Sequence, residues 1–473
     1  MSRPVDDRKK ALWAGRFQEE VDRDVQQFTR SVDLDRRLAP YDLAGTRVHV
    51  RMLSRQGILS ASDLQRILKA LDQIDEEIQR NEFPWRDELE DVHMNIEARL
   101  HELCGDAGRS VHAGRSRNDQ VAVDLKLFCL EAASEWSRLA HRLQAALVER
   151  AEPLVEQVFP GWTHLQAAQP LSWAHYLLAW VEMMERDRER IAAYLKIHSV
   201  SPLGAGALAG STLALDPEKV AEELGFQRAF RNSYDVVGDR DFALELSQIA
   251  VQIMLHLSRF SEDLIYLSST AVGWIELPDS LCTGSSMMPQ KKNPDVLELV
   301  RGKTASVIGH NAALTTLLKG IPTSYHRDLQ QDKSHLFPTV DAVASSLAIF
   351  HAAVRGFRID AKAVEADLQR GHLTATDLAE YLVSVGVPFR EAHEKVGKLV
   401  GLAIARDVGL AELTVDEIRS VEPRCREDVI SVLDPQGSLQ RRKHAGAAGI
   451  LPVRRQLEFW RRRLDGEGGE EKG

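Results

Sequence analysis

The sequence predicts an all-α fold in which several helices are long enough to form a bundle. Residues 125–152 and 239–271 contain neither glycine nor proline, so nothing in either stretch interrupts a helix. In the second stretch, apolar residues recur at spacings of three and four, which is typical of one helix face. These residues are Phe242, Leu246, Ile249, Ala250, Ile253, Leu257 and Phe260. Strand-like alternation is rare, and residues 47–50 are too few to predict a strand.

The composition indicates a globular protein with an acidic balance. Of the 473 residues, 44% are hydrophobic and 27% are charged, which excludes global disorder. The formal net charge is −10, which argues against a general binder of nucleic acid or of acidic membranes. A small anionic ligand held in a local basic pocket stays compatible with this balance.

Signals for secretion, membrane insertion or cofactor binding are missing from the sequence. Residues 1–17 lack the apolar core of a secretory signal, and no uninterrupted run of 18 apolar residues predicts a transmembrane helix. The cysteines are scattered without a C-x-x-C pair; they are Cys104, Cys129, Cys282 and Cys425. We therefore expect a reducing cytoplasm, with neither disulfides nor a zinc site. No metal or nucleotide motif occurs, so no cofactor is expected.

Breaks rich in glycine and proline divide the chain into three predicted domains. A first helical domain covers residues 1–114, a central long-helix bundle covers 115–365, and a C-terminal helical domain covers 366–473. The last residues, 466–473, read GEGGEEKG, and we expect them to form a disordered tail.

The segment 283–295 carries the strongest chemical signal. Gly284, Pro289 and Pro294 together exclude a helix, so the segment is predicted to be a loop. Hydroxyls, amides and two lysines within this loop suit an anionic ligand. A solvated polar connection is an equally acceptable interpretation of the composition alone.

Segments 112–120 and 161–170 carry a second and a third signal. Ser116 and Asn118 stand just before a long predicted helix, where free backbone N–H groups bind a carboxylate. An ordinary helix cap explains the same residues. His164 stands between Thr163 and Gln166 in a segment bounded by glycine and proline, which makes it an acid–base candidate.

A fourth segment, 319–333, contains polar side chains that suit a pocket. They are Tyr325, Gln330 and Lys333. An exposed helix start is the alternative, and taken alone it is favoured.

Taken together, these segments resemble the fumarase/aspartase superfamily and, within it, the argininosuccinate lyase/delta-crystallin family. The superfamily loop G-S-S-x-M-P-x-K-x-N-P matches residues 284–294. G-R-S-R-N-D-Q at 114–120, T-H-L-Q at 163–166 and D-L-Q-x-D-K at 328–333 agree with the family pattern. The resemblance spans nearly the whole chain.

The resemblance implies cleavage of argininosuccinate into arginine and fumarate by anti elimination, without metal or cofactor. By motif match, Ser285 removes the proton beside a carboxylate, and Lys291 and Asn293 stabilise the aci-carboxylate intermediate. His164 is the other member of the acid–base pair and is oriented by Glu298. Either residue of the pair can be the base, and we favour Ser285.

The resemblance also implies a set of substrate-binding residues. They are Ser31, Ser116, Asn118, Thr163, Asn293, Tyr325, Gln330 and Lys333. The match at Ser31 rests on a short motif. Arg115 and Arg117 are as compatible with structural ion pairs as with ligand binding.

The family architecture implies three mostly helical domains whose long helices assemble into a homotetramer with composite active sites. The expected partners are the small-molecule substrate and further copies of the chain, with no nucleic acid and no membrane. The chain departs from the usual pattern at Ala113, where threonine is usual, and at Ala205 and Gly238, where serines are usual. Two alternatives stay open: a related C–N lyase for another N-substituted aspartate, and an inactive structural homologue.

Overall fold

The structure is a computed structural model that describes residues 22–370 and 372–470. It confirms the all-α prediction, because helices carry nearly all of the regular structure and the described strands form only two-stranded sheets. The chain divides into two compact units. Unit 1 holds the described residues up to Ala132, with Tyr194–Leu246 and Ala312–Phe337, and unit 2 holds Ala133–Ala193, Ser247–Asn311 and the described residues from Pro338 on. The three-domain division stays a prediction.

Five long helices have residues in both units and confirm that long helices dominate the fold. They are α7 (Arg117–Ala151), α8 (Trp173–His198), α11 (Asp241–Ser268), α12 (Asp295–Leu318) and α13 (Asp332–Gly356). Helix α11 fills most of the stretch that lacks glycine and proline, and every residue of its predicted apolar stripe is buried. Burial of this stripe is what stabilises the helix.

One helical segment among the described residues is long and apolar enough to cross a membrane, by length and composition alone. It is Arg327–Gly356, whose most apolar 18-residue window has a mean hydropathy of 1.4 and is 50% buried inside the protein. A core helix of this length meets the same criteria, so the segment is weak evidence for a membrane span. The sequence analysis expected none.

Unit 1 contains short and medium helices, several of which build a hydrophobic core. The helices are α1 (Arg23–Thr29), α2 (Val32–Asp35), α3 (Ala39–Arg55), α4 (Ala61–Gln79), α5 (Val92–Cys104), α6 (Asp106–Arg109), α9 (Pro217–Glu223) and α10 (Ser233–Val236). Short 3-10 helices span Arg36–Leu38, Ser110–His112 and Arg327–Gln331, and strand β3 (Val200–Ser201) pairs in parallel with β4 (Arg228–Ala229). Leu43, Ile67, Leu71 and Ile96 lie in its core. This core supports the start of α7.

Unit 2 contains a second core in the C-terminal region. The helices of this region are α14 (Ala361–Arg370), α15 (Ala375–Ser384), α16 (Phe389–Ala405), α17 (Val415–Val421), α18 (Val429–Leu433), α19 (Pro435–Arg441) and α20 (Ile450–Glu470). Short 3-10 helices span Glu152–Leu154, Asp279–Leu281 and Leu410–Glu412. Leu378, Leu399 and Ile418 lie in this core. Helix α20 continues to Glu470, into the segment expected to be a disordered tail, and 471–473 lie outside the described residues.

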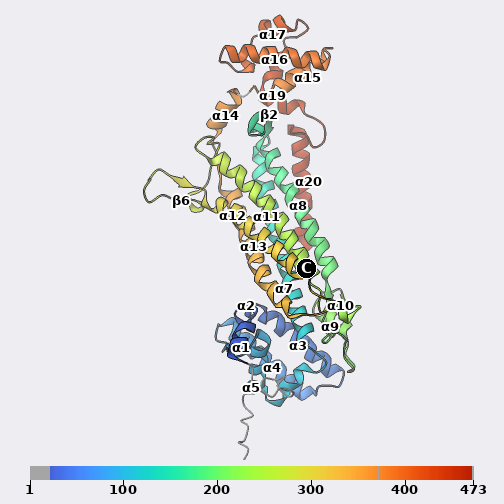
Figure 1. The fold of residues 1–473 in the computed structure, drawn as a ribbon. Helices are drawn as coiled ribbons and strands as arrows, with labels where there is room; N and C mark the ends of the chain where they lie inside the picture. Colours follow the sequence, from blue (N-terminus) through green and yellow to red (C-terminus); the bar gives the residue numbers. More distant parts are fainter. Residues whose placement is uncertain (1–21, 371, 471–473) are drawn as a thin grey trace, which may run out of the picture. The chain divides into compact units, whose positions relative to one another are not determined.

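Unit 2 also carries three antiparallel strand pairs. They are β1 (Val158–Thr163) with β2 (Gln166–Ser172), β5 (Ile275–Glu276) with β8 (Arg358–Ile359), and β6 (Thr283–Gly284) with β7 (Lys292–Asn293). The hairpin of β6 and β7 stands out from the helices of its unit (Figure 1). An aromatic cluster fixes the base of the other hairpin, with Phe159 stacked on Trp173 at 4.3 Å between ring centroids.

Candidate active site

The segment around Ser285 is a loop, as predicted, and β6 and β7 close it at its two ends. Ser285 follows β6 directly and is half-buried. Its Oγ accepts the backbone N–H groups of Met287 at 3.3 Å and of Met288 at 3.1 Å. Two N–H donors stabilise negative charge on an oxygen, so this geometry favours Ser285 over an ordinary serine as a proton acceptor.

The two adjacent lysines of this loop have different surroundings. Lys292 Nζ lies 2.7 Å from Asp279 and 3.1 Å from Glu276. The hydrogen bond to Asp279 raises the pKa of Lys292, and Glu276 adds to this effect. The exposed Lys291 ammonium has no ion-pair partner among the described residues. Lys292 therefore anchors the loop, and Lys291 is the lysine available to a ligand.

His164 occupies the tip of the β1–β2 hairpin. His164 and Leu165 form its two-residue turn, and both have a φ of 56°. This left-handed backbone is uncommon for residues other than glycine, and for such residues it costs on the order of 1–3 kcal/mol. Strain of this kind concentrates at functional sites, and here it holds an exposed histidine at the end of a rigid hairpin. The neighbouring Thr163 is also exposed.

The acid–base residues predicted in unit 2 are not bonded to one another among the described residues. Glu298 lies exposed in the first turn of α12. Among the described residues, no hydrogen bond or ion pair joins His164 to Glu298 or to Ser285. Half-buried Asn293 lies on β7, and β7 pairs with the strand that ends beside Ser285. The structure thus groups Ser285, Lys291 and Asn293 on one loop and presents His164 and Glu298 elsewhere in the unit.

In unit 1, the predicted binding residues Ser31 and Lys333 share one carboxylate. Ser31 Oγ donates to Asp35, and Lys333 Nζ lies 3.7 Å from Asp35 Oδ1 and 3.2 Å from Asp332 Oδ1. Arg240 pairs with Asp332 at 2.7 Å. Burial lowers the pKa of Lys333, but Asp332 and Asp35 outweigh it and hold the pKa above its ordinary value. Lys333 is therefore a fixed, buried cation.

Gln330 and Tyr325 lie in the same unit near this charge cluster. Gln330 Nε2 donates to the carbonyl of Thr29 at 3.0 Å, two residues before Ser31. Burial raises the pKa of Tyr325, and the positive charges of Arg240 and Lys333 act in the opposite direction. The structure thus brings Ser31 together with Gln330 and Lys333, which lie about 300 residues later in the sequence, and sets Tyr325 within electrostatic reach of Lys333.

Ser116 and Asn118 stand at the start of α7 and are half-buried. Ser116 Oγ accepts the backbone N–H of Asn118 at 3.3 Å, which makes Ser116 the helix cap considered above. Asn118 Nδ2 donates to the carbonyl of Ala207 at 3.2 Å. Asp119 accepts the N–H groups of Gly204 and Gly206 at 3.1 and 2.9 Å. These bonds fix the helix start against the loop that contains Ala205.

Arg115 and Arg117 both have structural partners. Arg115 Nη1 donates to Thr46 Oγ1 at 2.8 Å. Arg117 lies 3.5 Å from both Asp91 and Glu97. These contacts favour the structural interpretation of the two arginines.

No predicted site residue lines either of the following two cavities. A cavity of about 490 Å³ in unit 2 is lined by Trp173, Glu365, His372 and Gln436 among others. A cavity of about 310 Å³ in unit 1 is lined by Lys126, His198, Arg228 and Asp239 among others. The candidate residues instead lie on loops, helix starts and a hairpin tip.

Comparison with known proteins places the chain in a family. A family model described as lyase matches residues 15–309, and one described as argininosuccinate lyase C-terminal matches 372–440. The argininosuccinate lyase of Laribacter hongkongensis is 48% identical over 452 residues, covering 96% of this chain and 98% of its own. That of Thioalkalivibrio sulfidiphilus is 48% identical over 453 residues, covering 96% and 97%. The chain belongs to the argininosuccinate lyase family.

Solved structures agree on the fold. An EDDS lyase in complex with formate has a TM-score of 0.83 and 26% identity, covering 92% of this chain and 88% of that one. A class II fumarase from Schistosoma mansoni has a TM-score of 0.73 and 19% identity, covering 87% and 91%. The chain therefore has the fold expected from its resemblance to the fumarase/aspartase superfamily.

Two departures from the argininosuccinate lyase pattern lie around one predicted site residue. Ala205 belongs to a small buried cluster with Val236 and Val237, and Tyr325 packs against this cluster. A Cβ at Gly238 would lie 2.3 Å from the carbonyl oxygen of Ser324, so a serine there requires the backbone to shift. The third departure, Ala113, offers its carbonyl to His49 Nε2 at 3.0 Å, a contact that any residue type retains.

The sequence analysis missed the carboxylates that hold the argininosuccinate lyase motif residues in place. Asp35 and Asp332 position Ser31 and Lys333, and Asp119 fixes the start of α7. Asp332 and Asp119 lie inside the family motifs 328–333 and 114–120. The sequence does not show that these two carboxylates are buried, and their burial is what reveals their structural role. Asp35 follows Ser31 by four residues, and this helical spacing was the signal that could have found it.

Proposed function

We propose that this protein cleaves argininosuccinate into arginine and fumarate. The observation that carries the proposal is the 48% identity to argininosuccinate lyases over 96% of the chain. The match of residues 372–440 to the C-terminal region of that family supports it independently. An EDDS lyase variant of similar fold is known with bound fumarate, which supports a site for a fumarate product in this fold.

In the proposed reaction, the alkoxide of Ser285 takes the proton from the carbon beside a carboxylate and becomes the neutral hydroxyl. The electron pair first enters that carboxylate, and Lys291 and Asn293 stabilise the resulting aci-carboxylate. The pair then forms the double bond of fumarate while the C–N bond breaks. His164, oriented by Glu298, gives a proton to the leaving nitrogen of arginine. The two N–H donors on Ser285 Oγ support the choice of this residue as base.

Substrate binding is proposed for the remaining motif residues. Ser116, Asn118 and Thr163 would hold the carboxylates of the succinyl part. Ser31, Tyr325, Gln330 and Lys333 would complete the pocket, with the buried charge of Lys333 as its fixed cation. A net-acidic protein needs such local cations to hold a substrate with three carboxylates.

We further propose that the enzyme is a cytoplasmic homotetramer in which several copies of the chain complete each site. No hydrogen bond or ion pair among the described residues joins the exposed tip at His164 to Ser285 within one chain, which supports shared sites. Size-exclusion chromatography with light scattering tests the tetramer directly.

An absorbance assay of fumarate formation tests the activity. Argininosuccinate should be cleaved faster than other N-substituted aspartates supplied at equal concentration. Preference for another adduct would favour a related C–N lyase, a candidate supported by the departures around Tyr325 and the likeness to EDDS lyase. No turnover of any adduct would favour an inactive homologue, against which the retention of Ser285, His164, Lys291 and Asn293 argues.

A further inference from the structure

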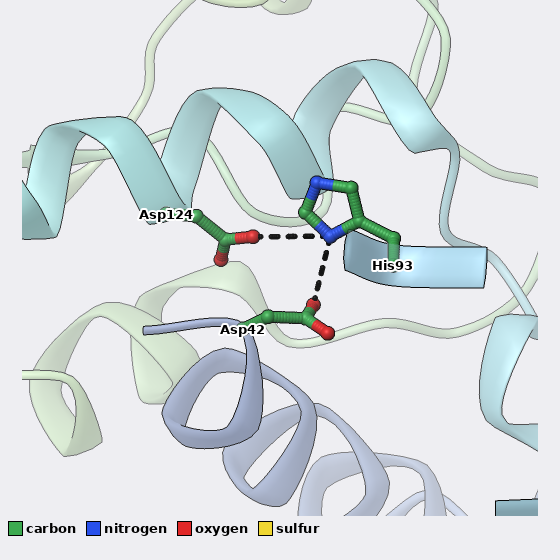
Figure 2. A group of neighbouring side chains, drawn as sticks. All are labelled: Asp42, His93 and Asp124. Atoms are coloured by element: carbon green, nitrogen blue, oxygen red, sulfur yellow. Dashed lines mark ion pairs between the residues drawn. The ribbon is translucent and has the colours of Figure 1, made fainter. Parts of the chain in front are cut away.

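A buried group of three side chains of metal-ligating types lies in unit 1, and none of the three is a residue assigned to the proposed reaction. Asp42 comes from α3, His93 from α5 and Asp124 from α7, and the three side chains point toward one another (Figure 2). Their exposed fractions are 1%, 1% and 0%. His93 Nδ1 lies 3.3 Å from Asp42 Oδ1 and 3.4 Å from Asp124 Oδ2.

Three polar atoms of this group lack the hydrogen bonds that buried polar groups require. Both carboxylate oxygens of Asp124 and the Nδ1 atom of His93 have no hydrogen-bond partner among the described residues. A buried carboxylate without a partner is strongly unfavourable, so the site calls for a positive charge among these atoms.

A single hydrogen on His93 Nδ1 does not meet this need. It can be directed at one carboxylate only, and both observed distances exceed the ~2.7–2.9 Å of a charge-assisted hydrogen bond. Ligand atoms bound at ~2.0–2.2 Å in a tetrahedral shell lie about 3.3–3.6 Å apart. The observed distances of 3.3 and 3.4 Å agree with that spacing.

The local charges also favour a divalent ion. Asp42 and Asp124 contribute two carboxylates to the group, and a divalent ion would balance their charge. Arg115 Nη1 donates to Thr46, and Arg117 is engaged by Asp91 and Glu97, so neither arginine forms an ion pair with these two carboxylates among the described residues.

We propose that Asp42, His93 and Asp124 bind one divalent transition-metal ion, with Zn²⁺ as the best match. One imidazole and two carboxylates are a ligand set that zinc accepts, with a water in the fourth position. Gln120 Nε2 donates to Asp42 Oδ1 at 2.5 Å and would orient that ligand. The ion would tie α3, α5 and α7 together, and it is a structural ion that takes no part in the elimination.

The test uses the full-length protein after treatment with a chelator. Zn²⁺ or Co²⁺ is added, unbound metal is removed, and bound metal is counted by mass spectrometry. We expect one ion per chain, visible absorption from bound Co²⁺, and a higher Tm with Zn²⁺. His93→Gln and Asp124→Asn should each weaken the affinity on the order of 100-fold or more.

His49→Gln is the matched control, because His49 is another buried histidine of unit 1 that faces the carbonyl of Ala113 instead of this group. It should bind the ion as the wild type does. A folded wild type that binds no ion would overturn the proposal and leave a shared proton as the explanation. Equal binding by both ligand variants would place the ion elsewhere and overturn it as well. Asp124→Asn is nearly isosteric, so it decides the question even if His93→Gln fails to fold.

Discussion

The loop around Ser285 and the charge cluster around Lys333 carry similar residue types in opposite environments. In the loop, Met287 is 87% exposed and Lys291 is exposed, and the loop is bonded mainly at its two ends. In the cluster, Lys333 is 2% exposed and is enclosed by Asp35, Asp332 and, through Asp332, Arg240. The comparison teaches that the exposed region can change with little cost to the fold, whereas the buried one couples binding to stability.

Among the substitutions in the exposed loop, Ser285→Ala should have the largest effect on activity. If its hydroxyl transfers the proton, Ser285→Ala should lose on the order of 10²–10⁴ in kcat. KM and Tm should change little, because the side chain is only half-buried and its own bonds are to its own loop. Steady-state kinetics and thermal melting measure both. A loss of tenfold or less would assign the proton transfer to another group.

Substitution in the buried cluster should instead act on stability. Asp332→Asn leaves Arg240 and Lys333 without their shared buried carboxylate, which should cost about 3–5 kcal/mol. Urea denaturation at matched protein concentration measures the loss. Asp328→Asn, an exposed carboxylate four residues earlier, is the control and should cost less than about 0.5 kcal/mol. Equal effects of the two variants would contradict the comparison.

The adjacent lysines give a matched pair within the exposed loop. Lys291→Met should lower kcat on the order of 10²–10³, the usual effect of removing one donor to a developing anion. Lys292→Met should lower it less than tenfold, because Lys292 pairs with Asp279 and Glu276 at the surface, where such pairs contribute about 0–1 kcal/mol. The opposite ranking in kcat would reverse the roles given to the two lysines.

The helices could be predicted from the sequence because their signal is local. The apolar spacing of Phe242, Leu246 and Ile249 identifies α11 without knowledge of what covers it. The β1–β2 hairpin could not be predicted, because its strands contain Pro160, Gly161 and Pro170 and its turn lacks the usual glycine or asparagine. Only tertiary packing on the aromatic cluster compensates for the left-handed turn.

The residues of the candidate site could likewise be predicted only where their sequence signal is local. Ser285, His164 and Lys333 were found because family motifs mark them in short segments. The group of Asp42, His93 and Asp124 has no sequence signal, because three helices bring together members whose successive positions are about 50 and about 30 residues apart. Packing alone creates that group, and the expectation of no metal rested on short motifs that such a group does not need.

The smallest expected effect is a partial recovery, and it tests whether the exposed region is shared between chains. His164→Asn and Ser285→Ala should each be nearly inactive. Unfolded together and refolded at equal ratio, they should form mixed tetramers. If one site takes His164 from one chain and Ser285 from another, each site draws both intact residues with a probability of about one quarter in a symmetric homotetramer. Activity should therefore return to about a quarter of wild type.

A site built within one chain predicts a different recovery of activity, so this experiment distinguishes it from a site shared between chains. If both residues of a site came from one chain, every site would keep one lesion, and mixing would restore nothing. Each variant refolded alone is the control and must stay inactive, since any recovery there would come from refolding itself. Native mass spectrometry must show mixed tetramers before the activity is interpreted. Mixed tetramers without recovery would reject the shared site. The lyase activity would then have to come from residues of a single chain at each site, including its buried charges around Lys333 and its exposed Ser285 loop.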